Sequence, residues 1–336
     1  MIAIMNDLLR SRVQFKWMLL LLLTLASNAH AARTYTPNDV YASVVYANLL
    51  ADSILAKKNI KNVQLPTSRE IATRPMHVYE LHSAILGQLH SYALTSGIRP
   101  PPLAVSTPIQ YTPTDVFYLT RIVSEKLEEL HGVEVGKVTS KKQTVSGKTP
   151  ADVYRVLFHL FYKLSRLNGK PNISPNEVYA HMFRAKEDLQ YSLLTLSRRL
   201  DESEEERKIL LVSAIYGMHP NGTLMPPKED NKKPVDVIQQ VFRIREKLNL
   251  LRQKNNLAQI TIPKLEVFGE VKPIDVFLQV QFIIAELNLL KLPMDITTTT
   301  NRPKPVTGKT PSDVLHEAKH IEYMLDRLLK FNLIGK

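Results

Sequence analysis

Apolar residues recur along most of the chain at alternating intervals of four and three residues. One such stretch consists of Val237, Val241, Ile244, Leu248 and Leu251. The spacing averages about 3.5 residues, which is typical of helices that pack side by side with shallow left-handed crossings. The same spacing follows seven other valines, and each stretch covers about twenty residues, or about 30 Å of helix. The pattern predicts an all-α protein with eight heptad-patterned helices.

A short phrase marks the start of each expected helix. Its form is Pro-x-Asp-Val, with an occasional change at the third residue, and it begins at Pro37, Pro75, Pro113, Pro150, Pro175, Pro234, Pro273 and Pro311. Proline suits the first helical position, because it lacks the N–H group that would have no partner there. An acidic third residue can bond back to the N-cap N–H and lies at the positive end of the helix dipole. Five copies also carry a hydroxyl residue before the proline, which predicts structural N-caps at Thr36, Thr112, Thr149, Ser174 and Thr310.

The spacing of the phrases indicates a tandem duplication. Neighbouring prolines stand 37 to 39 residues apart except around Pro175. The octapeptide SGKTPADV at 146–153 is nearly repeated as TGKTPSDV at 307–314, so the fourth and eighth copies correspond. A helix stop at Asn168 and Gly169 separates the two sets of four. We therefore expect one four-helix bundle over residues 32–168 and a second over residues 169–336.

Several connections between the expected helices are longer than bundle loops usually are. Four of them hold about sixteen residues, against a usual two to eight. A segment of that length can reach about 50 Å, which is enough to return along a helix. We therefore expect parallel helices with long extended return loops that bury Val133, Val135, Ile260, Ile262 and Val267. An up-down bundle with slack loops is the alternative. The fifth helix is expected to continue through Glu206, before a loop at 216–233.

The first thirty-one residues have the pattern of a secretory signal. Arg10, Arg12 and Lys16 precede an apolar run from Trp17 to Ala26, and small residues follow up to Ala31. Ten apolar residues are too few to span a bilayer, which needs about twenty. We expect cleavage near Ala31 and a soluble mature chain in the periplasm or outside the cell. An uncleaved N-terminal anchor is the alternative.

Composition narrows the possible chemistry. The 336 residues include 44 Lys and Arg against 32 Asp and Glu, a formal net charge of +12, and no cysteine. Disulfides, thiolate metal sites and cysteine nucleophiles are therefore excluded. With 11 glycines in all, nucleotide-binding glycine loops are not expected either. Export argues against nucleic acid as a target, whereas the positive charge favours an acidic partner or an anionic polymer of the cell envelope.

One stretch resembles a zinc-peptidase motif. His316, Glu317 and His320 form H-E-x-x-H on an expected helix, where the two histidines could share a metal and the glutamate could polarise its water. No third ligand follows at a suitable distance, since Tyr323 stands where the chain would have to turn toward Asp326. The favoured interpretation is a helix surface with partly buried histidines, and zinc binding is the weaker alternative.

The third residues of the helix starts suggest a second, weaker site. If the helices are parallel, Asp39, His77, Asp115 and Asp152 would gather at one end of the first bundle and could hold a cation. Independent caps explain the same residues without a ligand, and this is the favoured interpretation. His82 takes a core position where other copies have valine, and we expect a histidine with satisfied hydrogen bonds there.

The spacing of residues along the sequence does not indicate catalytic residues, a cofactor or a metal site. The sequence therefore favours a non-enzymatic, exported helical-repeat protein that acts as a protein-interaction or ligand-sensing module. An envelope structural protein that binds an anionic cell-wall or surface polymer is the alternative, and a hydrolase with a hidden site comes third. The partner, its chemistry and the oligomeric state are not determined by these patterns.

Overall fold

The protein is all-α over the residues that the structure describes. The computed structural model describes residues 34–60, 73–132, 145–170, 172–218 and 224–330, and these contain α-helices, two short 3₁₀ helices and no strand. The prediction of an all-α chain is confirmed. The α-helices are α2 (Pro37–Lys57), α3 (Pro75–Thr95), α4 (Pro113–His131), α5 (Pro150–Leu167), α6 (Pro175–Ser197), α7 (Glu205–Ile215), α8 (Pro234–Lys254), α9 (Pro273–Lys291) and α10 (Pro311–Lys330). The 3₁₀ helices are η1 (Glu202–Glu204) and η2 (Leu265–Phe268). The expected signal segment, 1–31, lies outside the described residues.

Within the described residues, every α-helix but α7 begins at one of the eight repeated prolines. The residue before the proline has an extended backbone in α2, α3, α4, α5, α6, α8 and α9, as at Thr36 with φ −106° and ψ 166°. Proline restricts its predecessor to this region and is itself fixed near the φ of a helix, so the chain enters the helix at that residue. The valine of each phrase is buried, with an exposed fraction of 1 to 2%. The local sequence thus decides where these eight helices begin.

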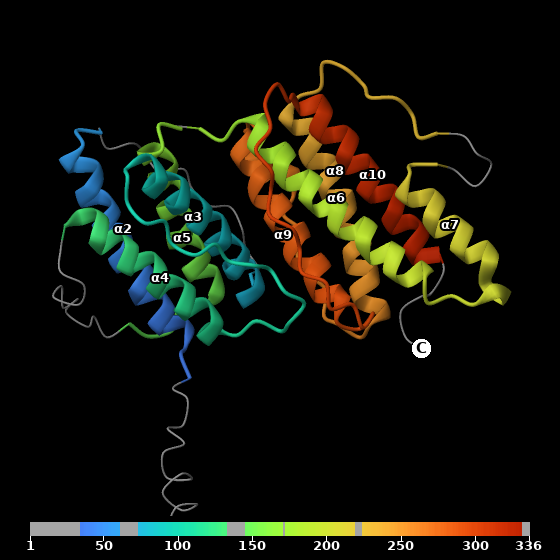
Figure 1. Cartoon of the computed structure of the whole chain (residues 1–336), viewed down its shortest axis with the longest axis horizontal. Helices are drawn as coiled ribbons and strands as arrows, with labels where there is room; N and C mark the ends of the chain where they lie inside the picture. Colours follow the sequence, from blue (N-terminus) through green and yellow to red (C-terminus); the bar gives the residue numbers. More distant parts are fainter. Residues whose placement is uncertain (1–33, 61–72, 133–144, 171, 219–223, 331–336) are drawn as a thin grey trace, which may run out of the picture. The chain divides into compact units, whose positions relative to one another are not determined.

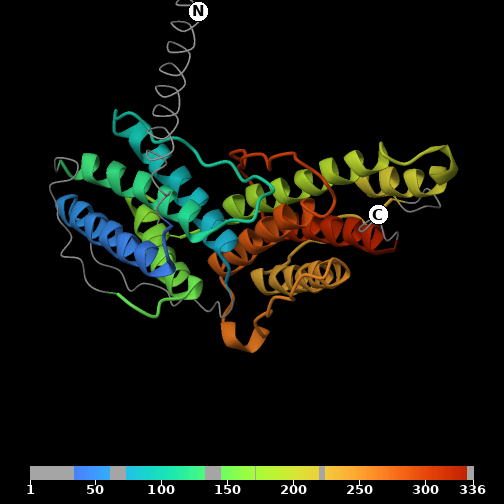
Figure 2. The same ribbon diagram turned by 90° about the horizontal axis from the view of Figure 1, so that it is seen from below.

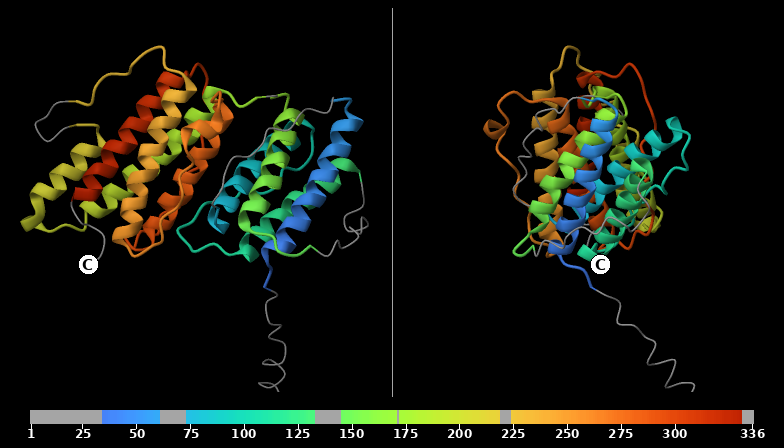
Figure 3. Two further views of the ribbon diagram at one scale, coloured as in Figure 1. Left: turned by 180° about the vertical axis from the view of Figure 1, so that it is seen from behind. Right: turned by 90° about the vertical axis from the view of Figure 1, so that its left-hand side faces the viewer.

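The helices pack in two groups of four. Both α2 and α3 contact α4 and α5, and both α6 and α8 contact α9 and α10 (Figure 1). Seen from behind, α5 lies beside α2 in one group and α8 lies beside α10 in the other (Figure 3). Helices α3 and α9 also contact each other, so the groups meet along these two helices. The apolar interiors of both groups belong to one continuous core.

The fifth expected helix is shorter than predicted. It ends at Ser197 as α6, and the chain then turns through η1 into the separate helix α7. The stretch 201–204 has no apolar residue to bury, and it forms a turn at the surface that includes η1. Helix α7 packs back on α6 and α10, where it buries Leu211 and Ala214 (Figure 2). The predicted continuation through Glu206 was therefore wrong.

The long connections bury apolar side chains, but one residue that we expected to be buried is exposed. Ile260 is buried and Ile262 is half-buried, whereas Val267 is 48% exposed. Residues 265–268 form the 3₁₀ helix η2, whose threefold repeat replaces the alternation of an extended segment and turns Phe268 inward instead. The prediction for Val267 was wrong for this reason. Val133 and Val135 lie outside the described residues.

Helix α9 is the most deeply buried helix. In the described part of the chain it alone is long and apolar enough to cross a membrane, and 78% of its most apolar window is buried inside the protein. It contacts α6 and α8 within its own group and α3 of the other group. A helix that is apolar on all faces is what such an enclosed position requires.

Candidate functional site

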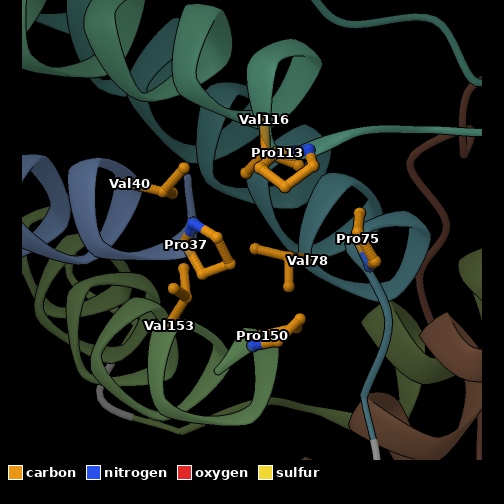
Figure 4. A pocket seen from close by; sticks show the side chains of 8 residues that line it. All are labelled: Pro37, Val40, Pro75, Val78, Pro113, Val116, Pro150 and Val153. Atoms are coloured by element: carbon orange, nitrogen blue, oxygen red, sulfur yellow. The ribbon is translucent and has the colours of Figure 1, made fainter. Parts of the chain in front are cut away.

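Two apolar hollows lie at the ends of the helix groups. In the first group, the proline and valine of each helix start line a small open hollow (Figure 4). Its lining residues are Pro37, Val40, Pro75, Val78, Pro113, Val116, Pro150 and Val153. The second group has a hollow of the same size lined by the corresponding residues, Pro175, Val178, Pro234, Val237, Pro273, Val276, Pro311 and Val314. Such surfaces can receive an apolar group, and their lining side chains offer no hydrogen bond to a polar one.

Hydrogen-bonded caps surround each hollow. Thr149 illustrates the arrangement: its N–H and its hydroxyl donate to Asp152 Oδ2 at 2.9 and 2.8 Å, and its hydroxyl accepts from the Asp152 N–H at 3.3 Å. Thr36, Thr112 and Thr310 make the same three bonds. Ser174 donates to Glu177 through its N–H and hydroxyl at 2.8 and 2.9 Å. The bonds from Thr310 lower the pKa of Asp313 to about 2.

Each of the four residues of the expected carboxylate ring bonds to the N-cap residue of its own helix. Asp39, Asp115 and Asp152 bond to their N-cap threonines, and His77 Nδ1 accepts from the Arg74 N–H at 2.9 Å. Among the described residues there is no group of three His, Asp or Glu side chains that could hold a metal ion. The convergence of the helix starts therefore brings together prolines and valines at the centre, with the carboxylates turned toward the backbone.

The H-E-x-x-H residues of α10 have separate partners. Nε2 of His320 donates to the carbonyl oxygen of Ala214 in α7 at 2.9 Å. Glu317 accepts from the Tyr179 hydroxyl at 3.0 Å and forms an ion pair with Lys186. His316 is half-buried and belongs to no potential metal-binding group in the described part of the chain. The motif thus joins α10 to α6 and α7.

The repeated octapeptide closes each group of four helices. Gly147 adopts φ 70°, a left-handed conformation that favours glycine, and directs the next residue toward α2. The Lys148 N–H donates to Asn38 Oδ1 at 2.8 Å, and the Lys148 ammonium lies 4.6 Å from the centre of the Tyr41 ring. The second group repeats these contacts with Lys309, Asn176 and Tyr179, at 2.7 and 4.3 Å. The last helix of each group is thereby tied to the first.

His82 is fully buried with both ring nitrogens bonded. Nδ1 donates to the carbonyl oxygen of Val78 at 3.0 Å, and Nε2 lies 2.8 Å from the Thr120 hydroxyl. Because a carbonyl can only accept, the proton of the neutral ring is on Nδ1, and Nε2 accepts from Thr120. Burial lowers the pKa of His82 to about 4. The ring is therefore neutral and structural at neutral pH.

Charged side chains are buried where α3 meets α9. Nδ1 of His77 accepts the Arg74 N–H, so its Nε2 carries the proton and donates to Glu286 Oε1 at 2.8 Å. Arg252 Nη1 donates to the other carboxylate oxygen at 2.6 Å. Burial lowers the pKa of His77. Burial raises the pKa of Glu286, but the bond from His77 and the charge of Arg252 outweigh it, so the net shift is downward.

A second set of buried charges lies beside the first. Arg184 of α6 contacts Glu80 of α3 at 3.3 Å and donates to the Ser106 hydroxyl at 2.8 Å. Lys291 forms an ion pair with Asp188 at 2.5 Å. Burial raises the pKa of Asp188, against the opposing charge of Lys291, and the two side chains are 3% and 1% exposed. The Arg184–Glu80 pair joins the two groups of helices, whereas Asp188 and Lys291 both belong to the second group.

Sequence reasoning missed these buried charges. In the helix pattern they occupy positions that would face solvent in an isolated bundle. One signal was present: α9 is apolar on all sides except for a few polar residues, among them Glu286 and Lys291. A charged residue in a wholly apolar helix indicates a buried partner.

Comparison with known proteins finds no counterpart of this chain. No protein-family model matches it, and neither a curated protein nor a solved structure matches it significantly.

Proposed function

We propose that the chain is a non-enzymatic, exported protein-interaction module built from two tandem four-helix bundles, over residues 32–168 and 169–336. The observation that carries this proposal is the pair of apolar hollows. Each is lined by four prolines and four valines from four helix starts. In this proposal each hollow receives an apolar side chain of an envelope protein, so that the chain offers two equivalent docking points.

The parallel arrangement within each bundle is supported by the hollows themselves. Four helices that each contribute their first and fourth residues to one hollow have their N-termini at the same end. Return segments would then run along the helices. In agreement with this, the segment 292–310 passes along α6, where Arg184 Nε donates to the Asn301 carbonyl oxygen at 2.5 Å (Figure 1). The matching cap contacts of Lys148 and Lys309 support a duplication.

His320, Glu317 and the buried charges bond to other parts of the protein, which favours docking over catalysis. His320 and Glu317 of the H-E-x-x-H motif form hydrogen bonds between helices. The buried charges bond to one another across α3, α6 and α9. The hollows that open to solvent are apolar and are framed by capped helix starts. Such surfaces suit recognition through burial of apolar groups, about 25 cal/mol for each Å².

The test places a charge in one hollow without disturbing the helix that carries it. Pro113→Glu puts a carboxylate at the lining of the first hollow, and glutamate at a helix N-terminus is favourable for the helix. The matched control is Thr114→Glu, one residue further along, which does not line the hollow. We expect the wild-type chain and the control to retain the same saturable partner from an envelope extract, and Pro113→Glu to retain less. Equal recovery with both variants would refute docking at the hollow.

The second candidate function is binding to an anionic envelope polymer. The formal net charge of +12 favours it, because long-range attraction raises the local concentration of anions. This alternative predicts sedimentation of the chain with cell-wall material that decreases steeply as salt is added. Sedimentation that does not change with salt would argue against it.

A further inference from the structure

The two apolar hollows open in opposite directions. Helix α5 starts at the first hollow and α9 starts at the second. The ring of Tyr154, near the start of α5, lies 5.5 Å from the ring of Phe282 in the middle of α9. Further along α5, the ring of Phe161 lies 5.1 Å from that of Phe277, which is closer to the start of α9. The two helices therefore run antiparallel, and their starts lie at opposite ends of the contact.

A contact at the edge of the first hollow gives the same direction and a length. Arg74 is the N-cap residue of α3, which starts at that hollow. Its Nη2 donates to the carbonyl oxygen of Ala258 at 3.2 Å, and Ala258 follows the C-terminal end of α8. Helix α8 has 21 residues and starts at the second hollow. The two hollows are therefore separated by about one helix length, or about 30 Å.

Buried contacts between the two groups of helices hold this arrangement. Glu80 of α3 and Arg184 of α6 form an ion pair at 3.3 Å, with side chains that are 0% and 3% exposed. His77 of α3 donates to Glu286 of α9 at 2.8 Å, and the apolar interiors form one core. A rotation that turned both hollows to one side would leave these buried groups without partners, which is strongly unfavourable.

The two hollows have the same chemistry. Each is lined by four prolines and four valines. Each group of helices is also closed by a lysine whose N–H donates to an asparagine side chain, Lys148 to Asn38 in the first and Lys309 to Asn176 in the second. An apolar side chain that fits one hollow therefore fits the other. A folded partner seated on one hollow cannot reach the second, which opens in the opposite direction.

We propose that the chain bridges two copies of one envelope protein, each of which seats an exposed apolar side chain in one hollow. This inference rests on the proposed docking function and adds the number and placement of the partner molecules. The antiparallel helix groups place the two copies on opposite sides of the chain. The buried contacts between α3, α6 and α9 keep the spacing between the copies fixed.

The experiment measures how many partner molecules one chain binds. The probe is the envelope protein that the immobilised full chain retains, purified after elution, and the molar ratio is measured by sedimentation equilibrium. Pro113→Glu places a charge in the first hollow and Pro234→Glu places one in the second. The matched controls, Thr114→Glu and Gln239→Glu, add the same charge on the same helices at positions that line neither hollow. Circular dichroism and the melting temperature report whether each variant is folded.

We expect two partner molecules for each wild-type chain and for each control. Each single hollow variant should bind one partner molecule, and the double variant should bind none. Latex beads coated with the purified partner should cluster when the wild-type chain or a control is added, because clustering needs both hollows. The single hollow variants should leave the beads dispersed.

The other results separate failure of the bridge from failure of docking. One partner molecule for each wild-type chain, lost with only one of the two hollow variants, would overturn the bridge and leave docking at that hollow. Retention of different proteins by the two single variants would overturn the identity of the two copies. Self-association of the wild-type chain that a hollow variant abolishes would assign the hollow to a second copy of this chain and overturn the proposal. Full binding by the double variant, or no retained protein, would refute docking itself.

Discussion

Acid should destabilise this protein through His82, and the effect can be isolated with one substitution. The ring is fully buried and neutral, with Nδ1 donating to Val78 and Nε2 accepting from Thr120. A second proton, on Nε2, would place a charge in the apolar core. Burial therefore lowers the pKa of His82 from 6.5 to about 4. The perturbation we consider is His82→Val, which introduces the residue found at this position in other copies of the repeat.

The direction in which stability changes with pH follows from comparing proton binding by the folded and unfolded chains. Above pH 6.5 neither form binds a proton at this ring, and the contribution to stability is complete. Between pH 6.5 and about 4 the unfolded chain binds the proton and the folded chain does not, so the folded state loses about 1.4 kcal/mol for each pH unit. The loss amounts to about 2 kcal/mol at pH 5 and reaches about 3 kcal/mol below pH 4. His181, whose pKa burial lowers to about 3, adds a loss of the same sign.

The assay is equilibrium unfolding in urea at pH 7, 6 and 5, for the wild-type chain and for His82→Val. The valine is smaller and should lower the free energy of unfolding at pH 7, since it leaves space in the core. The informative quantity is the difference between the two proteins, which should shrink by about 2 kcal/mol from pH 7 to pH 5. Other titrating groups are present in both proteins and cancel. A difference that stays constant with pH would refute the reasoning.

Three further substitutions test the caps, the buried ion pairs and the long connection. Thr149→Ala should lower the free energy of unfolding by about 1 kcal/mol in urea without altering partner binding, because it removes a cap; lost binding at unchanged stability would mark a recognition site instead. Lys291→Met should lower the free energy of unfolding by about 3–5 kcal/mol in the same assay, since Asp188 would be left buried without its ion-pair partner. A loss below about 1 kcal/mol would contradict the pairing. Phe268→Ala should lower the free energy of unfolding by about 3–5 kcal/mol, and Val267→Ser by less than about 0.5 kcal/mol. The reverse order would indicate an extended segment that buries Val267.

The helix starts could be read from the sequence because their physics is local. A proline, an N-cap hydroxyl and an acid three residues further on interact within four residues, and no other part of the chain is needed. The cap of Thr149 on Asp152 is of this kind. The heptad spacing likewise determined which face of each helix is buried, so that the valine of every phrase lies in the core. The all-α class followed from these two signals.

The position of the buried charges was decided by the tertiary structure. Glu286, Arg252 and His77 are 34 to 209 residues apart in sequence and meet only because α3 and α8 both pack against α9. A heptad pattern tells a helix which stripe faces its own bundle, but not whether a second bundle covers the opposite face.

The turn after α6 and the register of η2 also depended on the tertiary structure. Apolar and charged residues continue past Ser197 in a helix-compatible pattern, yet α7 folds back to bury Leu211 and Ala214 against α6 and α10. Phe268 takes the core place expected for Val267, because a larger ring fills the space beside Phe242. Sequence alone thus determined where helices begin and which face they bury, through contacts of short range. Which surfaces meet was decided by packing between distant segments, whose free energy no local pattern contains.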